Sequence, residues 1–394
     1  MTPLLAALLV TCLGALASLL VVLNLRARYL LPTLLLLGTA ALLTLTVGLR
    51  IQDSGADSLR LGPVATGDDA FVIEAATDPG VFVLPTAFTL DEEGNLYIGF
   101  EAGIRRARDL DGDGFYEDVS HFAYDAGWVF GLDFHDGALY GAIDGSVLRF
   151  RDQDGDGIAD EEVVLLSGLP QVHYGGHSNS GLVVAGDGLI YMTVGGTSDH
   201  GPELEPLGGT ILTMPIVGGT ADLYASGFRN PYDITFCPDG RLYASDNGPD
   251  STAADVDQSS EDEVNLVLPG RQYGYPEYFG VTDPSTGTES PVALLPLRAG
   301  ATGIVCHDGT GLPAEYAGNL FVTMWGTFTA PVETGRRVMR VQLFERPDGS
   351  VFGETTELAG AFGHPIDIVQ EADGNLLVLD FELGQVFRIR YVAE

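Results

Sequence analysis

The stretch EEGNLYIGF, residues 92–100, joins a tight turn to a short run of alternating apolar residues. The same phrase of turn, leucine or isoleucine, and usually an aromatic residue returns five more times. The further copies are HDGALYGAI (135–143), GDGLIYMTV (186–194), PDGRLYASD (238–246), YAGNLFVTM (316–324) and ADGNLLVLD (372–380). Strand repeats about 40 to 50 residues long are typical of propeller blades. The six phrases therefore predict an all-β, six-bladed β-propeller over residues 69–394.

Further alternating segments follow four of these phrases and predict additional strands in the blades. They are SVLRF (146–150), TILTM (210–214), RVMRV (337–341) and QVFRI (385–389). The early segment FVIEAA, residues 71–76, is expected to complete the C-terminal blade and so close the ring, which removes exposed sheet edges. One interval between phrases is much longer than the others, which predicts an insertion at roughly residues 250–300.

The N-terminus has a different composition. Residues 1–25 and 29–49 carry no charged side chain, and each run could cross about 30 Å of hydrocarbon as a helix. Arg26 and Arg28 lie between the runs, and positive residues favour the cytoplasmic side. We therefore expect a transmembrane helical hairpin over 1–50, a linker over 51–68, and a propeller outside the cytoplasm, periplasmic or extracellular. A cleaved signal peptide is the alternative.

The chain is strongly acidic. It has 19 basic residues, all of them arginine, against 55 acidic residues, and its formal net charge is −36. This charge argues against nucleic acid or an anionic membrane surface as a partner of the propeller, and it suits a domain that binds cations.

Cys237 and Cys306 both precede a turn containing Asp-Gly, which predicts equivalent buried positions in successive repeats. Whether they pair remains open, although a disulfide is conceivable outside the cell.

Two acidic loops, DLDGDGFYED (109–118) and DQDGDGIAD (152–160), share one pattern of alternating carboxylates. Oxygen ligands around a tight glycine turn suit Ca²⁺. A helix-flanked calcium loop needs a glutamate at its twelfth position, where this chain has Ser120 and Val163, so we expect loops between strands. The predicted ligands are Asp109, Asp111, Asp113 and Glu117 in the first loop, and Asp152, Asp154, Asp156 and Asp160 in the second. Acidic turns without metal are the alternative.

Five segments together resemble the glucose/sorbosone dehydrogenase family. They are GGHSNSGLVVAGDGLIY (175–191), ASGFRNPYDITFCPDGRLYASDNGPD (225–250), EDEVNLVLPGRQYGYP (261–276), LPAEYAGNLFVTMWGTF (312–328) and GHPIDIVQEADGNLLVLD (363–380). The resemblance covers essentially residues 80–391. It implies a six-bladed propeller that uses pyrroloquinoline quinone (PQQ) and Ca²⁺ to oxidise a sugar, passing electrons to an external acceptor.

Site residues carry over from this resemblance position by position. His177 matches the family's catalytic histidine, and Gly248 and Pro249 match backbone carbonyls that hold the Ca²⁺ touching PQQ. Glu263, together with Tyr273, lies in a segment that contributes to a second calcium site in relatives. The positions matched to the cofactor pocket are Arg229, Asn230, Asn247 and Arg337. Arginine forks suit the carboxylates of PQQ, and a neutral imidazole can take the proton of a sugar hydroxyl.

Two departures from the family pattern concern positive charge. A stretch that carries an arginine in many relatives reads GTFTA here, Gly326 to Ala330, and another common arginine is replaced by His364. Two alternative functions follow. One is a non-catalytic propeller, stabilised by calcium, that binds a glycan or a protein partner. The other is a calcium-dependent hydrolase of the lactonase type, against which the RNP and NGP motifs argue.

Overall fold

The computed structural model describes residues 62–66, 70–171, 177–198, 201–249, 261–297, 299–326 and 334–392. The chain divides into two compact units, Met1–Gly62 and Pro63–Glu394. Within the described ranges, no helix is long and apolar enough to cross a membrane. The hairpin expected over residues 1–50 lies outside the described residues and stays a prediction.

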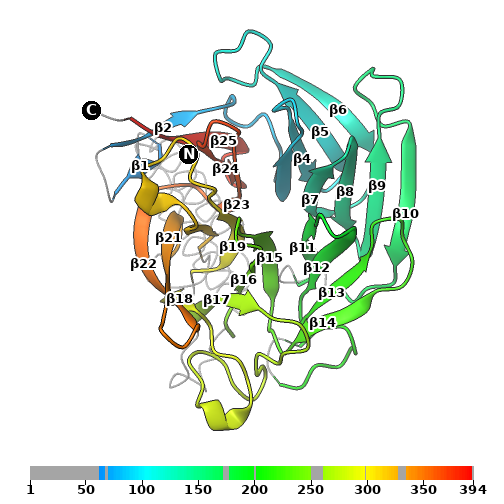
Figure 1. Ribbon diagram of the computed structural model, residues 1–394. Helices are drawn as coiled ribbons and strands as arrows, with labels where there is room; N and C mark the ends of the chain where they lie inside the picture. The colour runs from blue at the N-terminus through cyan, green and yellow to red at the C-terminus, as the bar shows by residue number, and fades with distance from the viewer. Residues whose placement is uncertain are drawn as a thin grey trace, which may run out of the picture. The chain divides into compact units, whose positions relative to one another are not determined.

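Strands of the second unit form six antiparallel sheets (Figure 1). Blade 1 comprises β3 (Ala87–Leu90), β4 (Leu96–Phe100), β5 (Gly103–Arg108) and β6 (Asp118–Tyr124). Blade 2 comprises β7 (Val129–His135), β8 (Ala138–Ile143), β9 (Ser146–Arg151) and β10 (Glu161–Ser167). Blade 3 comprises β11 (Asn179–Val184), β12 (Leu189–Val194), β13 (Thr210–Pro215) and β14 (Asp222–Ser226).

The C-terminal half supplies the other three sheets. Blade 4 comprises β15 (Pro231–Phe236), β16 (Leu242–Asp246), β17 (Glu261–Val267) and β18 (Ala293–Leu297). Blade 5 comprises β19 (Ala301–Cys306), β20 (Leu320–Met324), β21 (Arg337–Glu345) and β22 (Val351–Gly360). Blade 6 comprises β23 (Pro365–Gln370), β24 (Leu376–Asp380), β25 (Gln385–Tyr391) and β2 (Phe71–Ala75). Two short 3₁₀ helices, η1 (Pro284–Thr286) and η2 (Ala314–Tyr316), lie in connections.

The ring closes as the sequence predicts. Strand β2 pairs with β25, so the N-terminal segment at Phe71 completes the last blade. The first strand of each blade also contacts the first strands of both neighbours, and β3 touches β7 on one side and β23 on the other. An additional strand, β1 (Val64–Ala65), pairs with β22 at the outer edge of blade 5. The propeller therefore begins inside the segment that we expected to be a linker, 51–68.

The repeated aliphatic position lies in the second strand of every blade, and its side chain is at most 3% exposed. The six residues are Leu96, Leu139, Ile190, Leu242, Leu320 and Leu376. They pack into hydrophobic clusters between successive sheets. The turn-leucine phrase thus marks the position that anchors each blade in the core, which is why it repeats.

Three aspartates near the central axis hydrogen-bond one blade to the next, joining blade 2 to blade 3, blade 4 to blade 5 and blade 6 to blade 1. Their carboxylates accept backbone N–H groups from the first strand of the next blade, and they line a central cavity of about 140 Å³. The bonds join Asp133 to Val184 at 2.7 Å, Asp233 to Ile304 at 2.9 Å and Asp367 to Phe88 at 2.9 Å. Burial raises the pKa of Asp133 to about 7 and that of Asp233 to about 6. Each bond satisfies a buried N–H group that the strand ladder leaves open.

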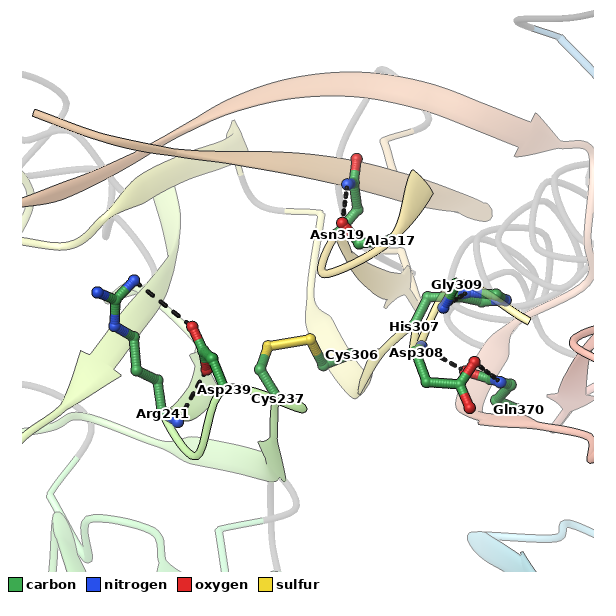
Figure 2. Close-up of a disulfide and its surroundings, with 10 residues drawn as sticks. All are labelled: Cys237, Asp239, Arg241, Cys306, His307, Asp308, Gly309, Ala317, Asn319 and Gln370. Atoms are coloured by element: carbon green, nitrogen blue, oxygen red, sulfur yellow. Dashed lines mark hydrogen bonds and ion pairs between the residues drawn. A yellow bond between two sulfur atoms is a disulfide. The ribbon is translucent and has the colours of Figure 1, made fainter. Parts of the chain in front are cut away.

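A disulfide joins Cys237 to Cys306, which answers the question that the sequence left open (Figure 2). Cys237 directly follows β15, and Cys306 is the last residue of β19, so the bond links the first strands of blades 4 and 5 at their C-terminal ends. It spans 69 residues of sequence. The insertion expected at roughly residues 250–300 lies between these two cysteines. It is shorter than predicted, because residues 261–267 and 293–297 form the regular strands β17 and β18 of blade 4.

Candidate functional site

The predicted catalytic histidine and three of the four predicted cofactor-binding residues lie at one end of blades 3 and 4. His177 stands two residues before β11, and Arg229 and Asn230 directly precede β15. Asn247 follows β16, and Gly248 and Pro249 come next. Because β16 runs antiparallel to β15, with Asp246 opposite Pro231, the end of one strand meets the beginning of the other. The repeat therefore brings residues from three separate strand ends to one end of these two blades.

Hydrogen bonds through Gly196 connect His177 to Arg229. His177 Nδ1 lies 2.7 Å from the Gly196 carbonyl oxygen, and the Gly196 N–H donates to the Arg229 carbonyl at 2.7 Å. A carbonyl can only accept, so we assign the proton of neutral His177 to Nδ1. This leaves the lone pair on Nε2, as a general base requires. The ring is 8% exposed.

Gly195 lets His177 and Asn230 approach each other closely. A Cβ atom placed on Gly195 would lie 2.4 Å from Asn230 Oδ1 and 3.0 Å from His177 Cα. Any side chain at position 195 would force the two site residues apart. The sequence analysis missed this glycine, although it follows directly after the strand of the repeated phrase.

Asn230 and Asn247 form the next part of the network. Asn230 Nδ2 donates to Asn247 Oδ1 at 3.2 Å, and Asn247 Nδ2 donates to the Ala301 carbonyl. Asn230 Oδ1 is buried without a hydrogen-bond partner among the described residues. A buried acceptor without a partner is rare in proteins, and it marks a place where a ligand or an ion can bind. The amide oxygen therefore fits a site that binds a donor or a cation.

Arg229 is 6% exposed and lies among buried carboxylates. Asp246 accepts the backbone N–H of Asn230 at 2.7 Å and that of Arg229 at 3.2 Å. Asp262 accepts the N–H of Gly248 at 3.0 Å. Burial and the nearby charge of Glu263 raise the pKa of Asp246 well above its usual value, and burial raises that of Asp262 to about 7. The positive charge of Arg229 opposes both shifts.

Asp246 was also missed, yet the repeated phrase contains a signal for it. The phrases of blades 4 and 6 both end in aspartate, at Asp246 and Asp380. Asp380 accepts the N–H groups of Gly363 and His364 at 2.6 and 3.1 Å, just as Asp246 accepts those of Arg229 and Asn230. A terminal aspartate in this phrase therefore caps the segment that leads into the first strand of the same blade.

Glu263, predicted to bind metal, lies directly opposite Asp246 across the β16–β17 ladder. It accepts the N–H of Gly280 at 2.5 Å and the side-chain amide of Asn265 at 3.2 Å. Burial raises the pKa of Glu263 to about 7. Asn265 Oδ1 is buried without a partner within the described part of the chain. The Tyr273 hydroxyl instead donates to the Leu266 carbonyl at 2.5 Å.

Arg337 differs from the other predicted cofactor ligands. Its guanidinium binds Glu357 on β22 at 2.6 Å and the Gly335 carbonyl at 2.9 Å. The preceding residue, Arg336, reaches His364 instead, with 3.5 Å between Nη2 and the imidazole Nε2. Within the GTFTA stretch only Gly326 is described, so residues 327–330 cannot be placed.

Both acidic loops gather carboxylates as the calcium prediction requires. Ligand atoms of Asp109, Asp111 and Glu117 lie within 4.8 Å of one another, as do those of Asp152, Asp154 and Asp156. The remaining predicted ligands bond to backbone: Asp113 accepts the N–H of Phe115 at 2.8 Å, and Asp160 that of Gln153 at 2.9 Å. The loops connect β5 to β6 and β9 to β10, which are the outer strands of blades 1 and 2.

A sequence model described as Glucose / Sorbosone dehydrogenase matches residues 136–388, well over half of the chain. Quinoprotein glucose dehydrogenase B of Acinetobacter calcoaceticus is 28% identical over 158 residues, 32% of this chain and 31% of that protein. The chain thus aligns with only about half or less of the length of the curated relatives it matches.

Two solved structures share the fold. The PQQ domain of pyranose dehydrogenase from Coprinopsis cinerea superposes with a TM-score of 0.68 at 17% identity, covering 84% of this chain and 97% of that one. The PQQ-bound aldose sugar dehydrogenase from Streptomyces coelicolor gives a TM-score of 0.64 at 18% identity, covering 84% and 99%. At these identities the likeness concerns the six-bladed architecture.

Proposed function

Because the chain belongs to the glucose/sorbosone dehydrogenase family, we propose that it is a PQQ-dependent sugar dehydrogenase. The observation that carries this proposal is the hydrogen-bonded network from His177 through Gly196 to Arg229. It fixes the orientation of the His177 ring through Nδ1 and links it to the backbone of the buried Arg229 at one end of the propeller. Such an arrangement can take a proton from a substrate next to an anionic group.

In the proposed reaction, a sugar hydroxyl gives its proton to His177 Nε2 while the attached carbon gives up hydride. PQQ, when bound, would supply the hydride acceptor and would pass the electrons on to an external acceptor. His177 keeps its orientation because Nδ1–H remains bonded to the Gly196 carbonyl.

Calcium completes the proposal at two kinds of site. Near the cofactor, the carbonyls of Gly248 and Pro249 would hold a Ca²⁺, which would supply Lewis-acid polarisation of the quinone. Glu263 is the proposed ligand of a second ion. Two buried carboxylates face each other there, at Asp246 and Glu263, and the orphaned amide oxygen of Asn265 is close by. A hard cation bound there would compensate the buried negative charge of these carboxylates.

The two acidic loops are proposed as structural calcium sites that tie outer strands together. We expect a chelator to lower the melting temperature of the folded protein, because the carboxylates of each loop then repel one another without a cation. Asp154→Ala should remove part of that response, since Asp154 belongs to the cluster of the second loop. Glu162→Ala, an exposed acid in the neighbouring strand β10, is the control. If chelation does not change the melting temperature, the two loops are acidic turns that bind no calcium.

We further propose a membrane-anchored protein whose propeller lies outside the cytoplasm. The two uncharged N-terminal runs and Arg26 and Arg28 support this topology, and a disulfide between Cys237 and Cys306 suits an oxidising compartment. Protease added to intact cells, or to cells whose outer membrane has been permeabilised, should digest the propeller. Full protection until the inner membrane is broken would contradict the topology.

The reaction class is tested with the full chain in detergent, supplied with Ca²⁺ and PQQ. We expect reduction of an artificial electron acceptor with at least one member of a panel of aldoses. If the protein neither binds PQQ nor reduces the acceptor, the alternative of a non-catalytic propeller is favoured. The arginines that relatives carry at the GTFTA stretch and at position 364 would then be the missing cofactor contacts.

A further inference from the structure

Glu203 lies in the connection between β12 and β13, and its carboxylate accepts hydrogen bonds from three backbone N–H groups and one hydroxyl. Oε2 accepts the Thr197 N–H at 2.6 Å, and Oε1 accepts those of Leu204 and Glu205 at 2.8 and 3.0 Å. The Thr197 hydroxyl also donates to Oε1. Burial raises the pKa of Glu203, but the hydrogen bonds from Glu205, Thr197 and Leu204 lower it more, so the pKa lies below its usual value. The side chain is therefore an ionised carboxylate held in one orientation.

Two glycines leave room for this carboxylate at the two ends of the connection. Gly196 follows β12 by two residues, and Gly208 precedes β13 by two residues. A Cβ atom on Gly208 would lie 2.4 Å from Glu203 Cδ, and one on Gly196 would lie 3.0 Å from Glu203 Oε2. A side chain at either position would push the carboxylate away, so the glycines let the backbone come close to it on both sides.

The peptide group between Gly196 and Thr197 joins this carboxylate to His177. Its N–H, on Thr197, donates to Glu203, and its carbonyl oxygen, on Gly196, lies 2.7 Å from His177 Nδ1. Tyr275–Pro276 is the one cis peptide bond in the described ranges, so this bond is trans. The C=O and N–H of a planar trans peptide point in opposite directions. The imidazole and the carboxylate therefore lie on opposite sides of one peptide group, each bound to it by a short hydrogen bond.

An ionised carboxylate strengthens the hydrogen bond on the far side of such a peptide. A hydrogen bond to a charged acceptor is stronger than one between neutral groups, and hydrogen bonds in a chain polarise one another. Donation from Thr197 to Glu203 thus increases the negative charge on the Gly196 carbonyl oxygen. This oxygen then favours the imidazolium form of His177 over the neutral ring, because the imidazolium carries a full positive charge. In Ser-His-Asp sites the carboxylate contacts the histidine directly, whereas here one peptide lies between them.

We propose that Glu203 is a positioning residue for His177, acting through the Gly196–Thr197 peptide to orient the imidazole and to strengthen it as a proton acceptor. The catalytic part of this inference rests on the proposed function, because it takes His177 as the base. Glu203 itself touches neither a substrate nor a cofactor. Its charge raises the basicity of Nε2 from the opposite side of the ring.

Other charged or titratable groups lie at this end of blades 3 and 4 and also respond to pH. Among the described residues they are Arg229, Asp246, Asp262, Glu263 and Tyr275, the last through its hydroxyl on the Ser198 carbonyl. Burial raises the pKa of both Asp262 and Glu263 to about 7, which is the range in which an imidazole titrates. The pH dependence of turnover therefore combines several groups, and the His177 ring has to be observed directly.

The test follows the His177 ring by NMR in the full chain, with isotope-labelled histidine, in detergent and without cofactor or sugar. A His177→Asn sample identifies its signal. In Glu203→Gln the midpoint of the imidazole titration should move to lower pH by about one unit, as expected for the loss of a negative charge one peptide group away. Glu203→Asp keeps the charge and should recover most of this shift. Glu205→Gln, which removes an exposed charge from the same connection, should move the midpoint by less than about 0.2 units.

Turnover supplies a second readout. With Ca²⁺, PQQ and a saturating aldose, Glu203→Gln should lower kcat by about threefold to tenfold, because a weaker base takes the proton more slowly. KM and PQQ affinity should stay nearly unchanged, since Glu203 contacts the backbone of its own connection.

The titration decides the inference. An unshifted midpoint in Glu203→Gln would overturn it, even if the melting temperature falls, because Glu203 would then only hold the connection in place. Equal shifts in Glu203→Gln and Glu203→Asp would also overturn it, since His177 would respond to the shape of the connection and not to the charge. If the midpoint shifts as expected but the unchanged protein reduces no acceptor, the proposed function fails while the effect of Glu203 on His177 stands.

Discussion

Replacing His177 by alanine should lower turnover by about 10² to 10⁴ and leave PQQ affinity nearly unchanged. General-base catalysis contributes a factor of this size, and the structure gives the imidazole the required tautomer, with Nδ1–H on the Gly196 carbonyl. The measurement is the rate of acceptor reduction with a saturating aldose, together with PQQ binding by absorbance. A loss confined to the rate identifies a group that moves a proton rather than one that captures the cofactor.

Two further variants make this result specific. His177→Asn keeps an N–H donor that can reach the Gly196 carbonyl but has no basic nitrogen, so it should be as slow as the alanine variant. His135→Ala removes a histidine at the opposite end of a first strand, β7, and should keep full activity. Added imidazole should restore part of the turnover of His177→Ala. Full turnover in His177→Ala would remove His177 from the role of base, whatever the reaction class.

The fold could be predicted because its signal is local. The turn-leucine phrase specifies a turn, a buried aliphatic residue and an alternating strand within nine residues, and blades repeat that unit. The long interval in blade 4 was harder, because β17 and β18 are separated by residues 268–292, which themselves hold no repeated phrase. Strand β1 was missed for a similar reason: two residues that pair with β22 carry no periodicity.

Side-chain direction could not be predicted in the same way. Arg336 and Arg337 are identical residues at adjacent positions, yet Arg336 lies beside His364 of blade 6 while Arg337 binds Glu357 within blade 5. The carboxylates around Arg229 posed the same problem. Asp246 and Asp262 belong to different strands. Only the register of β16 and β17, which sets Asp246 opposite Glu263, the neighbour of Asp262, brings both near one arginine.

That burial changes the expected effect of replacing Arg229. From the resemblance Arg229 is a cofactor residue, whereas in the structure its positive charge also acts on two buried carboxylates, Asp246 and Asp262. Removing one partner from a buried ionic cluster leaves uncompensated charge and costs about 3–5 kcal/mol. We therefore expect Arg229→Ala to lower the free energy of unfolding by this amount without any cofactor present, as measured by denaturant unfolding. Arg241→Ala, which breaks an exposed pair with Glu345, should cost about 0–1 kcal/mol.

The pH dependence of this loss in unfolding free energy distinguishes lost charge compensation from lost packing of the arginine side chain. The folded-state pKa values of Asp246 and Asp262 are raised by burial, and without Arg229 they should rise further. A group with a raised folded pKa favours the folded state at low pH, and this advantage is lost as the pH rises through the folded value. The deficit of Arg229→Ala should accordingly be small near pH 5, where these carboxyls are protonated in the folded variant, and larger near pH 8, because it grows as the pH rises through the folded pKa values. An equal deficit at both pH values would instead indicate lost packing of the arginine side chain, because the loss of packing does not depend on protonation.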